Sequence, residues 1–316
     1  MRIRLGVVMD PIESIRPAKD STLAMLLEAQ ARGWEIRYMR QQDLAIRGDA
    51  PRAWTRALRV RDDPADWFDL SDAREEDLRD FDVVLMRKDP PVDLHFLVAT
   101  WVLDRAHAAG TLVVNAPAAL RDMNEKLVAT RFPDCCPETL VSASEAMLTA
   151  FIEDQGTVVL KRTDLMGGRG IFVVRHGDPN TNVILEEMTL RGQRQVVAQA
   201  WVSTVSTAGD TRILMVDGEP VPQAVTRLPP DDDFRANLAT GASPRPAELT
   251  ERDRRICEIV GPVLAAEGVL FAGLDVIDGH LTEINVTSPT CIRELDAAFG
   301  LHIAADLFDA LEHLRA

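Results

Sequence analysis

The sequence is poor in cysteine and has no long apolar run. Its four cysteines, Cys135, Cys136, Cys257 and Cys291, show no CxxC spacing, so free thiols with a packing role are expected rather than a zinc site or a redox pair. The apolar run after Met1 is short, and no later stretch approaches the length needed to span a membrane. These absences predict a cytoplasmic protein without a membrane partner.

Basic residues are scarce relative to acidic ones. Thirty-five lysines and arginines against fifty aspartates and glutamates give a net charge of -15, which opposes binding to nucleic acid or to an anionic membrane. An anionic ligand must therefore be held by local cations. With 316 residues and 46% hydrophobic content, the chain is expected to form two or three packed lobes.

The glycine-rich segment lacks the context of two common phosphate-binding motifs. Gly167, Gly168 and Gly170 lie between two strand-like runs, TVVLKR and GIFVV, whereas a P-loop and a dinucleotide fingerprint both lead into a helix. The bare amides of this hairpin tip could fold over nucleotide phosphates, and Lys161 lies in the strand that leads into it. An ordinary turn is the alternative interpretation.

The first third of the chain alternates between strands and helices. The runs IRLGVVMD and WEIRYM flank an amphipathic helix at 21–32, and FDVVLMRK and TLVVN flank a second helix, HFLVATWVLDRAHAAG. This order predicts an α/β lobe with a small parallel sheet up to about Arg121. The segment 41–80 reads as a long excursion with one short strand at 57–60.

The second half of the chain is predicted to be mainly antiparallel. A helix at 121–132, which carries Lys126, begins a new unit, and VVAQAWV, TRILMVDGEPV and QAVTRL read as strands that continue one antiparallel sheet. The polar stretch from Pro229 to Pro246 reads as a mobile loop or lid. Further helices are expected at 144–153, 251–267 and 302–314.

Three arginines lie where an anion is needed. Arg87 follows the strand VVLM, and ligands of parallel sheets bind beyond such strand ends. Arg212 and Arg227 lie among apolar neighbours, where an unpaired charge would be costly. Either carboxylates of the protein or a bound ligand could supply the anions.

The most informative stretch is FAGLDVIDGHLTEINVTSPTCIR, which ends at Arg293. Asp275 lies in its first apolar run, and Glu283 and Asn285 lie in its second. If residues 278–280 form a three-residue loop, Asp275 faces Glu283 and Asn285 shares their face. Two carboxylates and an amide would then offer oxygen ligands to Mg²⁺.

Two other arrangements of this hairpin stay open. A two-residue loop at Asp278 and Gly279 would set Glu283 opposite Leu274 and separate it from Asp275, because a one-residue slip moves a side chain to the other face. A solvent-facing hairpin with ordinary acidic residues is the remaining alternative.

Several strings in the chain resemble those of one family, in the same order and spacing. They are GVVMDPI, KDSTLAMLLEAQARG, LMRKDPP, RDMNEKL, LMGGRGIF, VDGEPVP, GLDVI and LTEINVTSPTCIRE. Over nearly its whole length the chain resembles the bacterial glutathione synthetases of the ATP-grasp superfamily. The resemblance implies an α/β ATP-grasp fold with an N-terminal parallel-sheet α/β (pre-ATP-grasp) domain at 1–122, a small α+β lid lobe at 123–199, and a C-terminal mainly antiparallel-sheet lobe at 200–316.

The resemblance also implies an activity. It is the ATP- and Mg²⁺-dependent ligation of γ-glutamylcysteine with glycine, giving glutathione, ADP and phosphate through an acyl phosphate. Mn²⁺ is an alternative metal, and the family suggests a homotetramer.

The family's functional residues fall on specific positions of this sequence. By resemblance the metal would be held by Asp275, Glu283 and Asn285, and Arg212 would stabilise the acyl phosphate and the oxyanion. Positions implied for nucleotide binding are Lys126, Lys161, Gly167, Gly168, Gln199, Ala200, Trp201, Val202 and Asp210. Substrate carboxylates would meet Arg87, Arg227 and Arg293.

The chain departs from the family pattern at two loops. KRTDLMGG stands where relatives usually read KPLDGMGG, and Asp231, Asp232, Asp233 and Ala236 replace glycine-rich positions of the lid. Fewer glycines make a loop stiffer. Because both altered loops border the expected site, the identity of the acceptor amine stays open. The alternative functions are a related ligase with a different acceptor and a non-catalytic ATP-binding regulator.

Overall fold

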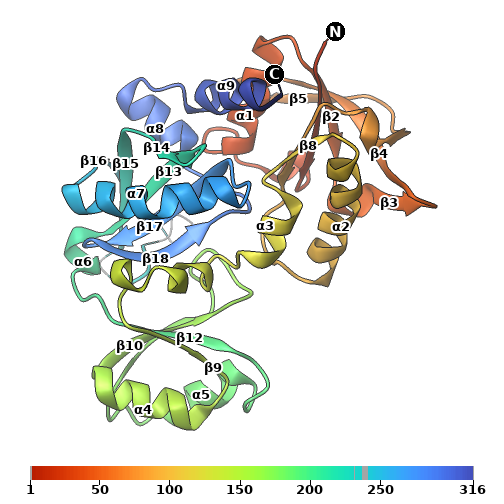
Figure 1. Ribbon diagram of the computed structural model, residues 1–316. Helices are drawn as coiled ribbons and strands as arrows, with labels where there is room; N and C mark the ends of the chain where they lie inside the picture. Colours follow the sequence, from red (N-terminus) through yellow and green to blue (C-terminus); the bar gives the residue numbers. More distant parts are fainter. Residues whose placement is uncertain (1, 231, 237–240, 316) are drawn as a thin grey trace.

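The computed structural model describes residues 2–230, 232–236 and 241–315. Within these ranges the chain forms three β-sheets, each covered by helices. Figure 1 shows the first sheet at the upper right, the last sheet at the left, the middle sheet at the bottom and both chain ends at the top. The expected α/β architecture, a parallel sheet followed by antiparallel ones, is confirmed. The domain limits at 122 and 199 stay a prediction.

The first sheet is built around four parallel strands. In spatial order they are β2 (Glu35–Met39), β1 (Arg4–Met9), β7 (Val83–Arg87) and β8 (Leu112–Val114). Helices α1 (Ser21–Ala31) and α9 (Ile303–Arg315) pack together on one face, and α2 (Leu94–Ala108) and α3 (Pro117–Asp122) pack on the other. The strands are almost continuously apolar because both faces are covered.

The segment 41–80 is not an irregular excursion, so that prediction is wrong, although the strand expected at 57–60 is present as the end of a longer one. It forms an antiparallel extension of the first sheet with β3 (Leu44–Arg47), β4 (Ala50–Val60), β5 (Phe68–Leu70) and β6 (Arg74–Asp77). Along β4 buried Ala53, Thr55 and Leu58 alternate with exposed residues such as Arg56 and Arg59. The period of two was present in the sequence, but arginines on the outer face hid it.

The middle sheet is small and antiparallel. It has the order β11 (Ile171–Arg175), β10 (Thr157–Arg162), β12 (Val196–Ala200), β9 (Thr139–Ser142). Helices α4 (Glu145–Gln155) and α5 (Thr181–Thr189) cover it. The strand VVAQAWV therefore belongs here, and the prediction that it shares a sheet with the two runs after it is wrong.

The last sheet carries the acidic hairpin. Its order is β16 (Ser243–Glu248), β15 (Gln223–Leu228), β13 (Asp210–Val216), β17 (Phe271–Ile277), β18 (His280–Asn285), with β14 (Glu219–Pro220) on β13. Helix α7 (Glu251–Ala266) packs on one face, and α8 (Ile292–Phe299) and α9 pack on the other. The short helix α6 (Val205–Ala208) precedes β13.

Two further predictions need correction. The segment 121–132 is not one helix, because α3 ends at Asp122 and Lys126 lies in a turn before the 3-10 helix η4 (Val128–Arg131). Within the expected lid, residues 243–248 form the edge strand β16. Residues 231 and 237–240 of that stretch lie outside the described residues. The other 3-10 helices are η1 (Ile12–Ser14), η2 (Gln41–Asp43), η3 (Leu78–Asp80) and η5 (Pro133–Cys135).

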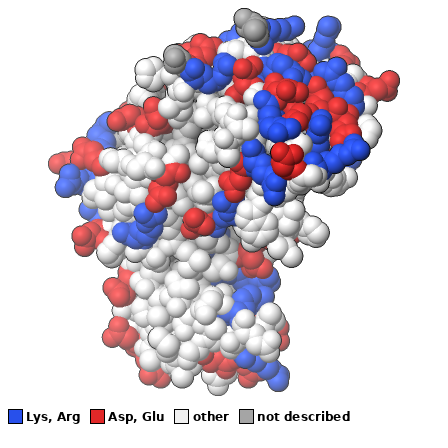
Figure 2. All heavy atoms as spheres, turned by 45° about the vertical axis from the view of Figure 1, so that its right-hand side comes forward, with Lys and Arg blue, Asp and Glu red and all other residues white. Residues whose placement is uncertain are grey.

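The cysteines are unpaired, as the sequence predicts. All four are free, and Cys135, Cys257 and Cys291 are buried. In the described part of the chain, no helix combines the length and apolarity that crossing a membrane requires. Figure 2 shows acidic and basic side chains interspersed over the upper lobe, while much of the visible lower lobe is uncharged.

Asn115 ties the first sheet to the last one. It follows β8, is buried, and uses its whole amide: Nδ2 donates to the carbonyls of Phe271 (2.8 Å) and Val286 (2.7 Å), and Oδ1 accepts the N–H groups of Leu270 (2.9 Å) and Phe271 (3.0 Å). These backbone groups lie at the open end of the β17–β18 hairpin. One side chain therefore fixes where this hairpin begins and ends.

We expect Asn115→Ala to lower the free energy of unfolding by about 2–4 kcal/mol, because it leaves buried backbone groups without partners. Urea denaturation followed by circular dichroism measures the change. The matched control is Asn180→Ala, which removes an exposed amide side chain whose one hydrogen bond within the described residues is to Asp178 and should change stability by less than about 0.5 kcal/mol. Equal stability of the two variants would contradict the role of Asn115.

Candidate active site

Two adjoining cavities share Asp275 and Glu283: the first lies between the middle sheet and the last sheet, and the second lies between the last sheet, the glycine-rich tip and the first lobe. The predicted site residues in the first cavity are Lys161, Gln199, Ala200, Trp201, Val202, Asp210, Asp275 and Glu283. Those in the second are Gly167, Arg212, Arg227, Asp275, Glu283 and Asn285. The fold thus brings together most of the residues that the sequence singled out, from both halves of the chain.

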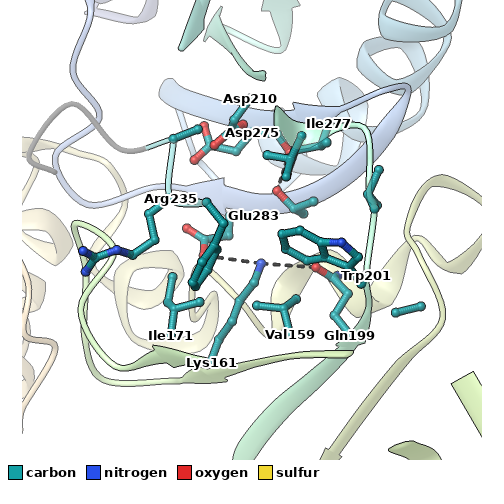
Figure 3. A pocket seen from close by; sticks show the side chains of 16 residues that line it. Val159, Lys161, Ile171, Gln199, Trp201, Asp210, Arg235, Asp275, Ile277 and Glu283 are labelled. Carbon is teal, nitrogen blue, oxygen red and sulfur yellow. Dashed lines mark hydrogen bonds and ion pairs between the residues drawn. The ribbon is translucent and has the colours of Figure 1, made fainter. Parts of the chain in front are cut away.

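Two lysines flank Glu283. Lys161 lies on β10 and donates to the Gln199 side-chain oxygen at 3.2 Å, and its Nζ is 3.7 Å from Glu283 Oε1. Figure 3 shows this ammonium between the two side chains. The Lys126 Nζ is 3.9 Å from the same oxygen and donates to the Leu165 carbonyl at 2.6 Å. Both ion pairs are long, so Glu283 is held only loosely.

The glycine-rich tip has the left-handed backbone that its residues allow. Gly167, Gly168 and Gly170 have φ values of 65°, 78° and 65°, which residues with a Cβ rarely adopt. Gly167 lines the second cavity. The Gly168 carbonyl accepts from Arg235 Nη1 at 3.2 Å, so the tip contacts the segment that follows β15.

The acidic hairpin has the predicted pairing but not the predicted loop. Its loop has two residues, Asp278 and Gly279, and Ile277 pairs with His280. A β-bulge between Asp275 and Val276 then shifts the register by one residue. Asp275 therefore faces Glu283, and Asn285 reaches Asp275 with its Nδ2 at 3.2 Å.

Asp275 is the centre of a buried ion-pair cluster. Arg212 donates to both its oxygens, Nε to Oδ1 at 2.6 Å and Nη2 to Oδ2 at 3.0 Å. Arg227 Nη2 lies 3.0 Å from Oδ1 and donates to Asp210 Oδ2 at 2.6 Å. The protein's own carboxylates thus supply the anions that the two arginines need.

The cluster strongly shifts the pKa values of its two carboxylates, Asp275 and Asp210. Burial alone would raise the pKa of Asp275, but Arg212 and Arg227 hold it well below its ordinary value. Burial raises the pKa of Asp210 to about 7, with only partial compensation from Arg227. Asp210 Oδ1 and Arg227 Nε are buried without a hydrogen-bond partner, and such groups mark a site that a ligand can complete.

The oxygen donors of Asp275, Glu283 and Asn285 suit a hard cation only if a ligand fills the remaining positions around it. The described residues contain no group of three or more His, Cys, Asp or Glu that could hold a metal ion. Asp275, Glu283 and Asn285 offer two carboxylates and an amide oxygen, which is the donor chemistry of Mg²⁺ when phosphate and water fill the remaining positions. The arrangement is consistent with a metal that arrives with a phosphate compound.

Two arginines predicted to bind substrate lie outside both cavities. Arg87 is buried, donates to Thr22 Oγ1 at 3.1 Å and to the Pro289 carbonyl at 2.8 Å, and burial lowers its pKa to about 10. Arg293 pairs with Asp62 at 2.8 Å. The structure therefore uses both side chains to join segments of the protein.

Sequence reasoning missed several residues of the second cavity. They are Arg16, Lys19, Glu125, Thr287, Ser288, Thr290 and Glu294. Arg16 and Lys19 come soon after β1. The rule that ligands lie beyond strand ends could have found them.

Two family models together match nearly the whole chain. Residues 3–121 match the model of the prokaryotic glutathione synthetase N-terminal domain, and residues 125–300 match that of the prokaryotic glutathione synthetase ATP-grasp domain. The chain is 53% identical over 312 residues to a glutathione synthetase of Pseudomonas syringae pv. tomato, covering 99% of this chain and 98% of the relative. It is 49% identical over 310 residues to that of Escherichia coli, covering 98% of each.

Solved structures share the fold at low sequence identity. The D-cycloserine synthetase DcsG superposes with a TM-score of 0.66 at 16% identity, covering 98% of this chain and 99% of that one. The D-alanine–D-alanine ligase of Bacillus anthracis superposes with a TM-score of 0.62 at 12% identity, covering 100% and 99%. The expected ATP-grasp fold is confirmed.

Removing one partner of the buried ion pair between Arg212 and Asp275 should destabilise the folded protein. We expect Arg212→Met to lower the free energy of unfolding by about 3–5 kcal/mol, because the buried carboxylate of Asp275 loses its bidentate partner. Adding Asp275→Leu should restore much of that loss, since the buried carboxylate, which Arg227 alone compensates only in part, is then removed as well. Urea denaturation of both variants tests this, and a double variant no more stable than Arg212→Met would refute it.

Proposed function

Because the chain belongs to the prokaryotic glutathione synthetase family, it is an ATP-dependent ligase that makes glutathione, and we propose that γ-glutamylcysteine and glycine are joined where its two cavities meet. It acts on small-molecule substrates and uses ATP with a divalent metal. The observation that carries the proposal is that both cavities share Asp275 and Glu283. A phosphate donor in one cavity and a carboxylate in the other would meet at these residues.

The nucleotide belongs in the first cavity. Lys126 and Lys161 would act as point charges on its phosphates, and the backbone of residues 200–202 would read the adenine edge. In the present conformation this cavity has only about 70 Å³ of free volume, whereas ligand pockets usually have about 300–1,000 Å³. The segment 234–236, which lines it, must move outward as the nucleotide enters.

We assign the divalent metal to Asp275, Glu283 and Asn285. Glu283 is the least committed of the three, because its ion pairs with the lysines are long. When bound, the metal neutralises charge on the nucleotide phosphates. Mg²⁺ is our assignment because all three donors are oxygen atoms, and Mn²⁺ is the alternative.

Arg212 is placed to act on the carboxylate that reacts. It uses Nε and Nη2 for Asp275, which leaves Nη1 for a ligand in the second cavity. An oxygen of the cysteinyl carboxylate attacks the γ-phosphorus of ATP, the bond from that phosphorus to the bridging oxygen breaks, and ADP leaves. The product is an acyl phosphate, whose oxygens Arg212 can grip.

The second step forms the peptide bond. The unprotonated amine of glycine attacks the acyl carbon, and the oxyanion that develops lies beside Arg212. Phosphate leaves and the amine loses its proton. By closing again once the nucleotide has entered, residues 234–236 would limit hydrolysis of the acyl phosphate by water. The homotetramer and the cytoplasmic location stay predictions.

The proposal predicts the substrate dependence of phosphate release. Purified protein with Mg-ATP should release phosphate only when γ-glutamylcysteine and glycine are both present, because the acyl phosphate needs the amine to discharge it. A coupled phosphate assay with each substrate omitted in turn measures this. Release with other amines but not glycine would instead favour the related ligase, which the altered tip KRTDLMGG suggests.

Removing the Lys161 charge should lower the efficiency with which the enzyme uses ATP. We expect Lys161→Met to reduce kcat/KM for ATP by about 10- to 100-fold, the usual effect of losing one charge-assisted contact, while KM for glycine stays unchanged. The matched control is Arg175→Met, on an exposed position of the neighbouring strand β11. An equal loss of kcat/KM in the two variants would show that the loss comes from the overall change in charge and not from a contact between Lys161 and phosphate.

A further inference from the structure

A turn, rather than another strand, covers the outer edge of β18. Within the described residues β18 is the last strand of its sheet, and η4, which follows the turn, packs against it (Figure 1). The carbonyl of Glu125, in this turn, accepts the N–H group of Ile284 at 2.9 Å. A backbone donor that would otherwise face an open sheet edge is therefore satisfied.

The side chain of Glu125 holds the same segment a second time, just beyond the end of β18. Its Oε1 accepts twice from Thr287, from Oγ1 at 2.6 Å and from the backbone N–H at 3.3 Å. Both residues are buried. Asn285 lies between the two anchored positions, Ile284 and Thr287, so Glu125 fixes the backbone on both sides of it.

The side chain of Asn285 is oriented by the neighbouring strand. Its Nδ2 donates to the Gly273 carbonyl at 3.3 Å and to Asp275 Oδ2 at 3.2 Å, which leaves Oδ1 for the proposed metal. Because an asparagine side chain is short, the position of Oδ1 depends directly on where the backbone of residue 285 lies.

The residues on either side of Glu125 contact the same site. Lys126 brings its Nζ to 3.9 Å from Glu283 Oε1. Asn124 donates from Nδ2 to the carbonyl of Thr163 at 3.0 Å, in the loop that carries the glycine-rich tip. Three consecutive residues therefore connect the acidic hairpin with this loop, and Glu125 is the one that holds the hairpin backbone.

A buried carboxylate is a costly way to hold a strand end, which indicates a specific task. Burial raises the pKa of Glu125, and the hydrogen bond from Thr287 and the charge of Lys126 act against this. In return, a carboxylate accepts stronger hydrogen bonds than a neutral oxygen does. The end of β18 is therefore held more firmly than a neutral capping residue would hold it.

We propose that Glu125 is a positioning residue for the metal site, which acts through the backbone of Asn285. The inference rests on the proposed function, because it takes the assignment of the metal to Asp275, Glu283 and Asn285 as its premise. Asn285 is the one member of this set that ends its strand, so its place depends on contacts outside the sheet. Loss of such an outer contact commonly weakens metal binding by about 10- to 100-fold.

Binding of Mn²⁺ together with ADP tests this position without the reaction. Electron paramagnetic resonance measures the free Mn²⁺ that remains as the protein is titrated. We expect Glu125→Leu to weaken Mn²⁺ binding in the presence of ADP by about 10- to 100-fold. Thr287→Val removes one donor to the carboxylate and should weaken it by about 10-fold. Thr287→Ser keeps the hydroxyl and should bind Mn²⁺ as tightly as the unaltered protein.

Two controls separate positioning from general damage to the fold. Glu153→Gln removes an exposed charge on α4, outside both cavities, and should leave Mn²⁺ binding unchanged. Calorimetric binding of ADP without metal should be the same in Thr287→Val as in the unaltered protein, because a damaged nucleotide site would lose it.

Two results would overturn the proposal. One is a Thr287→Val variant that binds Mn²⁺ with ADP as tightly as the unaltered protein, and the other is a Thr287→Ser variant as weak as Thr287→Val. If the unaltered protein binds no Mn²⁺ in the presence of ADP, the metal assignment of the proposed function fails first, so the two failures are distinguishable.

Discussion

The carboxylate of Asp275 is buried, and the cost of burying an unpaired charge fixes the register of the sheet around it. Cross-strand pairing sets Arg212 on one side of Asp275 and Glu283 on the other, so one row across β13, β17 and β18 carries an arginine, an aspartate and a glutamate. Asp210 and Arg227 form a second pair, two residues along β13. A slip of one residue would turn these charges toward the apolar face that packs on α7. The ion pairs of Arg212 and Arg227 with Asp275 therefore also specify the register of this sheet.

Local patterns predict the parts of this fold that depend on one segment. The helix at 21–31 and the pairing of Asp275 with Glu283 follow from periodicity and from the position of the acids within apolar runs. The bulge that produces this pairing is not visible in the sequence, because a three-residue loop and a two-residue loop followed by a bulge give the same register beyond them. Arg87 shows the wider limit. Its guanidinium donates to two neutral acceptors, the Thr22 hydroxyl and the carbonyl of residue 289, which are far away in sequence, and no local pattern encodes such contacts.

The contacts between the middle sheet and the last one include the ring pair of Trp201 and Phe234, at 5.8 Å, and several polar contacts. Lys161 approaches Glu283 at 3.7 Å, Lys126 donates to the carbonyl of Leu165, and Arg235 donates to that of residue 168. Contacts of this kind contribute little net stability when water can replace them. A nucleotide bound to the same groups would substitute for them, so its binding can alter the position of the small lobe at low cost. The strong ion pairs, in contrast, lie within the last sheet, so Arg212 need not move with the small lobe.

Arginine and lysine are used for different tasks in this site. Arginine holds permanent anions: Arg212 grips Asp275 with two nitrogens, as its planar fork allows. Lysine faces groups that exchange partners, because a compact ammonium forms no bidentate pair. An arginine at position 161 could grip Glu283 in the way that Arg212 grips Asp275. It would then occupy the one carboxylate of the proposed metal set that is only loosely held. An ammonium at this position leaves that carboxylate available, which explains why an arginine-rich chain has lysine there.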